Sequence, residues 1–373
     1  MKAVSIYGKM VVIGIFLLGT FGVSLCHVSP LHAEDFAPTV LFGAYGMGMA
    51  VSEGGGAADS AGSTGVSGLL GWRKPLSSGG YMAVNSSFDI RCCFIGLQEI
   101  DDDEMTALEI SLPVGENRVK IEAGFSSSIF GTGSYPGYIR PDWKVEYHLQ
   151  RGKGKVQPYG AYRGYILIQP GGNEDAFFQG GELGFSYRPS IRLGYEVNLG
   201  GGFEHWPEFP LYDDAGNTTG EKRRDYLINL QGKVEGLIGY FVDWQLDGSL
   251  MLRLSNANRY LESLAIIDSN SESRLGINLE TGVEWSPSRR INLQIGPYAA
   301  CDLYFEREAL KEDGSLLGER LKVFTIGSTF RADWTADDRL YLVLQGSGAR
   351  KYSNDISETG WNLIIKGGIE YSF

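Results

Sequence analysis

Apolar and polar residues alternate with a period of two through most of this chain. In residues 291–305, one face carries Ile291, Leu293 and Ile295, whereas the other begins with Asn292 and Gln294. The same alternation recurs in residues 191–203, 242–254, 275–285, 324–334 and 361–373, and the apolar faces of these stretches contain no charged residue. A period of two is typical of β-strands whose two faces meet different surroundings.

The pattern predicts sixteen strands. They lie near residues 40–51, 64–73, 81–90, 104–113, 118–126, 141–150, 157–168, 177–188, 191–204, 223–238, 240–254, 273–285, 291–305, 320–335, 339–350 and 361–373. Short connections alternate with longer polar ones, such as residues 52–63, 207–222, 255–272 and 306–319. Strands joined in this way form an up-and-down antiparallel sheet, so the predicted fold is an all-β barrel of about sixteen strands. Fourteen or twelve strands are the alternatives.

The length of the strands and the width of the barrel decide which face meets water. Many predicted strands exceed the usual length of about 5–6 residues in soluble proteins, and they suit a tilted membrane crossing of about 9–11 residues. A barrel of about sixteen strands encloses an aqueous lumen, so the apolar face should point outward to lipid. A secreted soluble β-protein is the alternative. Aromatic residues near the strand ends resemble membrane girdles: Trp72, Tyr81, Trp143, Tyr187, Phe203, Trp244, Trp285, Phe305, Trp334, Trp361 and Tyr371.

The beginning of the chain has the pattern of an export signal. Two lysines precede an apolar run at residues 10–25, and the small residue Ala33 follows. This order predicts a signal peptide at residues 1–33, cleaved after Ala33, and a single barrel domain over residues 34–373. A lipid-modified Cys26 and an uncleaved membrane anchor are the alternatives.

Composition excludes several classes of protein. The chain of 373 residues has 43% hydrophobic residues, which is too apolar for a disordered chain. It carries 33 Lys and Arg against 45 Asp and Glu, a net charge of −12, which argues against nucleic acid as a partner. Its 4 cysteines are too few for a disulfide-stapled scaffold, and the sequence leaves the state of Cys92 and Cys93 open.

The last predicted strand carries a recognisable pattern. Residues 361–373 place apolar side chains at alternate positions and end on Ile369, Tyr371 and Phe373. This resembles the C-terminal signal of Gram-negative outer-membrane β-barrels, although Gly367 departs from it by being small. The resemblance implies a bacterial outer-membrane location, contact with outer-membrane lipid, and recognition of Phe373 by the barrel assembly machinery. It also implies that both termini face the periplasm and that the longer loops lie outside.

Signals for catalysis are weak. His148 and His205 are the histidines beyond residue 33, and neither is followed at the second position by the serine found in outer-membrane phospholipases. No His and Cys cluster has zinc-ligand spacing. The sequence therefore predicts no enzyme activity, no cofactor and no metal.

Charged residues on the inward face form the candidate site. Within the stretches 118–126 to 361–373, we predict that fifteen of them line a pore. They are Glu122, Arg163, Glu182, Arg192, Glu196, Lys233, Asp243, Asp247, Arg253, Arg274, Glu280, Asp302, Arg331, Asp333 and Lys366. Because inward acids outnumber inward bases, we expect a mild preference for cations. The alternative is that these charges pair across strands and only hold the wall together.

The lumen and the resemblance favour passive transport through a porin-like outer-membrane channel for ions or small polar solutes. A plugged or closed barrel acting as a scaffold, adhesin or docking protein is the second reading, and an outer-membrane enzyme is the third. The porin resemblance also allows a homo-oligomer. Residues 126–140 form a candidate constriction loop, and Pro297, which lies in mid-strand, predicts a β-bulge.

Overall fold

The computed structural model describes one barrel domain. Its described residues are 39–53, 59–95, 100–130, 137–150, 155–169, 175–213, 215–261, 266–268, 271–311, 315–337, 339–355 and 358–372. All of them belong to the second of two units, Met1–Ala37 and Pro38–Phe373. The predicted signal peptide and the terminal Phe373 lie outside the described residues.

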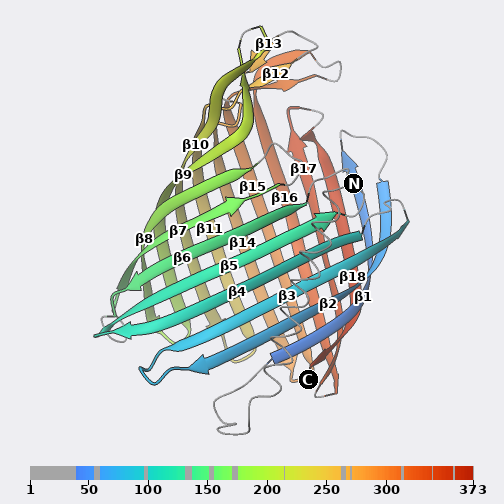
Figure 1. The fold of residues 1–373 in the computed structure, drawn as a ribbon. Coiled ribbons are helices and arrows are strands. Elements are labelled where there is room, and N and C mark those ends of the chain that lie inside the picture. The colour runs from blue at the N-terminus through green and yellow to red at the C-terminus, as the bar shows by residue number, and fades with distance from the viewer. Residues whose placement is uncertain are drawn as a thin grey trace, which may run out of the picture. The chain divides into compact units, whose positions relative to one another are not determined.

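Sixteen antiparallel strands close into the barrel (Figure 1), as the sequence pattern predicts. They are β1 (Thr39–Glu53), β2 (Asp59–Pro75), β3 (Tyr81–Ile95), β4 (Ile100–Val114), β5 (Asn117–Phe130), β6 (Tyr138–His148), β7 (Gln157–Leu167), β8 (Ala176–Ser190), β9 (Leu193–Tyr212), β10 (Thr218–Ile238), β11 (Val242–Ser255), β14 (Arg274–Ser288), β15 (Ile291–Leu310), β16 (Leu316–Asp337), β17 (Leu340–Ser353) and β18 (Gly360–Ser372). Each strand pairs with its neighbours in sequence, and β1 pairs with both β2 and β18. This pairing leaves no strand edge open.

The two ends of the barrel differ. Seven short turns join β2 to β3, β4 to β5, and so on to β16 and β17, and all lie at one end, which we call the turn end. Gly115 and Gly239 have φ values of +62° and +69° in two of these turns, a conformation that favours glycine. Leu41 pairs with Ser372, so β1 begins and β18 ends at the turn end.

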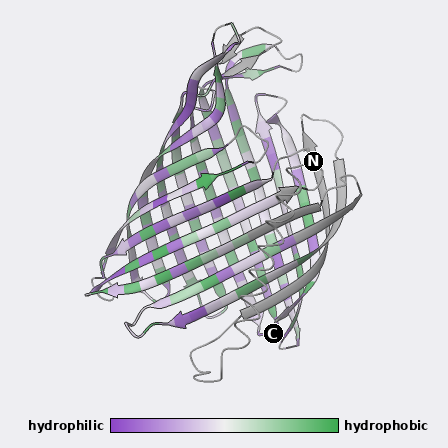
Figure 2. Cartoon of the chain, viewed as in Figure 1, coloured by the Kyte–Doolittle hydropathy of each residue, from purple (hydrophilic) through white to green (hydrophobic). Residues whose placement is uncertain are grey.

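The barrel has an apolar outside and a polar inside. On β11, Leu246, Leu250 and Leu254 are 37%, 42% and 46% exposed, whereas Asp243 and Asp247, on the alternate positions, line internal cavities. Figure 2 shows the same alternation of hydrophilic and hydrophobic residues along many of the strands. Large apolar side chains therefore face away from the lumen, as the period of two requires.

Several connections predicted as long loops are largely strand. β9 continues to Tyr212, and β10 already begins at Thr218. In the same way, β15 continues to Leu310, and β16 begins at Leu316. The connection from β11 to β14 contains a small hairpin, β12 (Arg259–Leu261) and β13 (Ile266–Asp268). These extensions lack the apolar alternation because polar residues occupy both faces, as in residues 218–224, so a pattern based on one apolar face does not detect them.

The predicted bulge at Pro297 is wrong. Glu280 pairs with Tyr298 and Val283 pairs with Ile295, so the register between β14 and β15 is the same on both sides of the proline. The ladder instead omits the two pairs between these positions, because proline has no N–H to donate. On the other side, Pro297 pairs with Ser328 of β16 without a shift.

Tyr81 is the one residue of the predicted girdle that we find on the wrong face. Its hydroxyl donates a hydrogen bond to the Glu109 carboxylate, and the Arg73 guanidinium lies 3.7 Å from its ring centre. A tyrosine suits either face, because its ring is apolar and its hydroxyl is polar. The residue type therefore does not determine which face of the barrel Tyr81 occupies.

Candidate functional site

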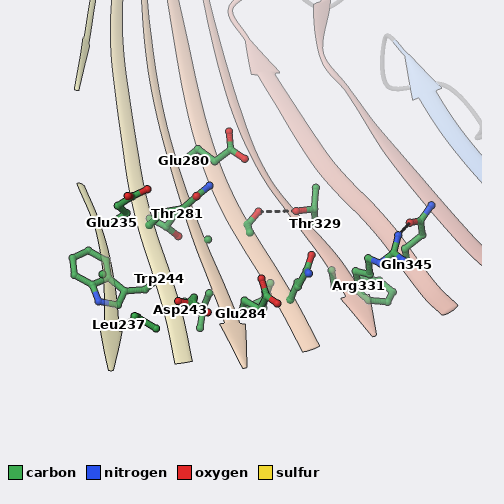
Figure 3. Close-up of a pocket in the computed structure, with 18 of the residues that line it drawn as sticks. Glu235, Leu237, Asp243, Trp244, Glu280, Thr281, Glu284, Thr329, Arg331 and Gln345 are labelled. Atoms are coloured by element: carbon green, nitrogen blue, oxygen red, sulfur yellow. Dashed lines mark hydrogen bonds between the residues drawn. The ribbon is translucent and has the colours of Figure 1, made fainter. Parts of the chain in front are cut away.

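A cavity of about 820 Å³ lies inside the barrel at the turn end, and we call it the turn-end cavity. Residues from β3, β8–β11 and β14–β18 line it, so most of the barrel wall contributes. Figure 3 shows Glu235 of β10, Asp243 of β11, Glu280 and Glu284 of β14 and Arg331 of β16 around this space. A second cavity of about 360 Å³ lies against β9–β11 and β14, and it shares Glu280 with the turn-end cavity.

Acids without cationic partners occupy one side of this space. Asp243 and Glu280 line the turn-end cavity, and Asp247 and Glu280 line the smaller one. Among the described residues, no lysine, arginine or histidine forms an ion pair with any of these three. Glu284 accepts a hydrogen bond of 2.9 Å from Asn292 Nδ2. These carboxylates form an acidic wall, defined as Asp243, Asp247, Glu280 and Glu284.

The bases in the turn-end cavity at β16–β18 are neutralised by acids. Arg331 Nε lies 2.8 Å from Asp333 Oδ1, and Arg331 Nη2 lies 3.1 Å from Glu370 Oε2. Lys366 Nζ lies 3.3 Å from Asp89 Oδ2 of β3. The structure therefore pairs the predicted Arg331 with the predicted Asp333 of its own strand and with Glu370 of β18, and it pairs the predicted Lys366 with Asp89 of β3.

The wall formed by β7–β11 carries a buried polar network. Arg253 Nη2 lies 3.4 Å from Glu204 Oε2, and its Nη1 lies 3.5 Å from Asp225 Oδ2, a carboxylate with no exposed surface. Arg163 lies 4.0 Å from Glu182. The buried carboxylates of Glu204 and Asp225 need such partners, because burial of an unpaired charge carries a large desolvation free energy.

Tyr159 and Tyr165 join this network, although neither was predicted as an inner-wall residue. Tyr159 Oη donates to Glu182 Oε1 at 3.0 Å and to Glu196 Oε1 at 2.9 Å, and Tyr165 Oη donates to the Glu204 carboxylate. Both tyrosines share the alternate positions of Arg163 on β7. Their position on the same face as Arg163 could have identified them, but only charged residues were considered as pore-lining candidates.

Aromatic rings of the inner wall lie over glycines. The Phe178 ring covers Gly202 of β9, where an added Cβ would lie 2.6 Å from Phe178 Cζ. The Tyr159 ring covers Gly184 of β8, where an added Cβ would lie 2.7 Å from Tyr159 Oη. A ring that lies flat on the wall takes less of the lumen than one that stands upright, so these glycines help to keep the interior hollow.

The remaining predicted residues divide into paired and separate ones. Glu122 forms an ion pair with Lys120, and Lys233 Nζ lies 3.2 Å from Glu235 Oε2. Arg274 Nε lies 3.5 Å from Asp302 Oδ1. Arg192 lies apart, with its guanidinium 5.7 Å from the Tyr240 ring centre and no ion pair to a described acid. The predicted set is therefore a wall of local pairs together with the acidic wall.

The two histidines lie on opposite faces. His148 Nε2 lies 3.1 Å from Glu146 Oε2 on the inner face, and its ring stacks on Tyr159. His205 stacks on Phe203, which is not on the inner face. Within the described part of the chain, no three His, Cys, Asp or Glu side chains group as metal ligands would. Cys301 is a free thiol, whereas the side chains of Cys92 and Cys93 lie outside the described set.

Known proteins resemble the chain in architecture. OccAB1 of Acinetobacter baumannii matches with a TM-score of 0.49 and 9% identity over 91% of this chain and 97% of its own. A bacterial polysaccharide outer membrane secretin matches with a TM-score of 0.44 and 9% identity, over 89% of this chain and 98% of its own. OmpT of Vibrio cholerae matches with a TM-score of 0.42 and 10% identity, over 92% of this chain and 99% of its own. No family model matches the chain, and no curated protein does.

In the described residues, no helix is long and apolar enough to cross a membrane.

Proposed function

We propose that this protein is an outer-membrane channel for passive diffusion of ions or small polar solutes. The observation that carries the proposal is the closed barrel with exposed apolar side chains outside and ionised side chains around internal cavities inside. In water such an outside would be unfavourable, because contiguous apolar surface of this extent marks contact with a partner or a membrane. In a bilayer the same surface is buried, and closure leaves no strand edge without a partner.

The proposed location is the bacterial outer membrane, which the chain would reach through the periplasm. A leader cleaved after Ala33 would deliver the chain to the periplasm. The apolar residues Ile369 and Tyr371 at the end of β18, with Phe373, would then serve the barrel assembly machinery of the outer membrane. Deletion of Phe373 should lower the amount of folded barrel in the outer membrane, whereas the amount exported to the periplasm should not change.

A preference for cations follows from how the inner charges pair. Most predicted inward bases have an acid within 4.0 Å, such as Arg331, Lys366 and Arg253. By contrast, the acidic wall has no cationic partner in the described structure. Paired charges cancel at the distance of a passing ion, so the unpaired groups determine the local potential, and among them the four carboxylates of the acidic wall outnumber Arg192.

Planar bilayer recording tests both parts of the proposal. The purified protein should give steady open steps, and in a salt gradient its reversal potential should indicate preference for cations. The variant D243N/E280Q should move the reversal potential toward zero. E221Q/E319Q is the matched control, because it also removes two charges, and Glu221 and Glu319 are exposed near the opposite end and line neither cavity. Absence of conductance would refute the channel, and clear anion preference would refute the role of the acidic wall.

A further inference from the structure

Three consecutive turns form a continuous surface at the turn end. The β8–β9 turn contains Ile191 and Arg192, the β10–β11 turn runs over residues 239–241, and the β14–β15 turn consists of Arg289 and Arg290. In each turn, one backbone carbonyl accepts a hydrogen bond from a backbone N–H of the next hairpin. Leu237 N donates to Arg192 O at 3.0 Å, Ser286 N donates to Phe241 O at 2.8 Å, and Thr335 N donates to Arg290 O at 2.8 Å. We call these turns, with Arg339 of the following turn, the turn arc.

The turn arc carries net positive charge, because its four arginines outnumber the two acids that adjoin it, Asp337 and Asp338. Arg289, Arg290 and Arg339 are exposed, and none of them pairs with an acid of the described structure. The three consecutive turns contain no Asp or Glu. Asp243, two residues after Phe241, and Glu284, five residues before Arg289, line the turn-end cavity inside the barrel, whereas Asp337 and Asp338 precede Arg339 in sequence. The chain as a whole is acidic, with a net charge of −12, so this basic arc runs against the overall charge.

The turn arc also exposes large apolar side chains. Ile191 and Tyr240 are 85% and 84% exposed, and Ile238 and Phe241 are 64% and 61% exposed. These fractions exceed those of the leucines on the outer face of β11, which are 37–46% exposed. Turn residues that face only water are usually polar. Apolar rings and guanidinium groups together suit the boundary between hydrocarbon and headgroups, where each finds its own partner.

We propose that the turn arc is a docking surface for the phosphates of anionic phospholipid headgroups. Its guanidinium groups match phosphate oxygens in charge and geometry, while Tyr240 and Phe241 enter the adjoining apolar layer. The inference rests on the membrane placement in the proposed function.

Spin-labelled lipids test this inference in the intact protein. The barrel is reconstituted in phosphatidylcholine vesicles with spin-labelled phosphatidylglycerol or phosphatidylcholine, and the immobilised fraction of each label is measured. We expect phosphatidylglycerol to be preferred about threefold at low salt and the preference to approach one in 0.5 M NaCl, because surface attraction is screened. The variant R289Q/R290Q/R339Q should lose the preference at low salt.

A matched control removes the same charge from the other end. Lys222, Arg224 and Lys311 are also exposed, so K222Q/R224Q/K311Q should keep the preference. Equal loss in both variants, or equal immobilisation of the two labels by the natural protein, would overturn the inference while leaving the membrane placement intact. Loss of the preference with millimolar inorganic phosphate, but not with NaCl of the same ionic strength, would show a soluble-anion site instead of a lipid surface. No immobilised lipid at all would refute the membrane placement itself.

Discussion

At the scale of single residues, two asparagines extend the sheet where a strand ends. Asn256 Oδ1 accepts from Arg224 N at 2.7 Å, and its Nδ2 donates to Lys222 O at 3.2 Å. Asn354 repeats the arrangement with Lys322 N at 2.9 Å and Arg320 O at 2.8 Å. Each side-chain amide thus takes the place of a peptide group in the ladder. The two sites stabilise the hairpins β9–β10 and β15–β16 at the level where the neighbouring strands stop.

The variant N256A should loosen the β9–β10 hairpin. It removes two hydrogen bonds, each worth about 0.5–1.5 kcal/mol, so amide exchange in residues 218–224 should become roughly tenfold faster. Hydrogen exchange followed by mass spectrometry measures this. N256D keeps the acceptor and should have a smaller effect, and unchanged exchange in N256A would contradict the role given to the amide.

Glu358 should make the β17–β18 loop sensitive to acid. Burial by itself raises the pKa of Glu358, but hydrogen bonding to Lys351 and the charges of Lys351 and Arg307 outweigh it and hold that pKa below its usual value. The carboxylate lies 2.5 Å from Lys351 Nζ and 2.8 Å from Arg307 Nη2. Because the folded pKa is the lower one, these ion pairs stabilise the loop above the unfolded pKa. The stabilisation is lost as pH falls through the folded pKa.

The measurement is amide exchange in residues 353–360, corrected for intrinsic rates, between pH 7 and pH 3. Protection in the natural protein should be constant down to about pH 4.5 and then fall. E358Q should show weaker protection with no such fall. A fall of the same size in E358Q would assign the acid sensitivity to another group.

At the scale of elements, close packing of rings on glycines links neighbouring strands. The variant G184A places a methyl group against the Tyr159 ring, whose side chain supplies the three nearest atoms. We expect it to lower the free energy of unfolding by about 1–3 kcal/mol, as overpacking does. Thermal unfolding of the detergent-solubilised barrel measures the loss. In G184A/Y159A the two effects should be less than additive, and G232A, with no atom within 4 Å of the new Cβ, should be tolerated.

The sequence predicted the strands well where one face is apolar. All sixteen barrel strands, and their in-and-out phase from β9 to β18, follow from the alternation of residues. The hairpin extensions beyond residues 204 and 305 were not predicted, because their two faces are alike. Ser128 pairs with Tyr138, so strands also occupy much of the candidate constriction loop 126–140, and residues 131–136 lie outside the described set.

At the scale of the whole molecule, the charges of the wall could be predicted but not their pairing. Lys366 of β18 meets Asp89 of β3, and Arg331 of β16 meets Glu370 of β18, in each case beyond the adjacent strand. Such pairs depend on strand register and on closure through β1, which the alternation does not fix. That the predicted residues line a conducting pore stays a prediction, and substitutions in the acidic wall test it most directly.

The central claim is that the apolar face meets lipid and the charged face meets water. Spin labels placed one at a time at positions 244–250 of β11, in a background with Cys92, Cys93 and Cys301 replaced by serine, test it in reconstituted vesicles. Labels at 246 and 250 should be accessible to oxygen dissolved in the bilayer, and labels at 245, 247 and 249 should be accessible to a water-soluble nickel reagent. The opposite alternation, or equal access of the nickel reagent to every position, would contradict the account.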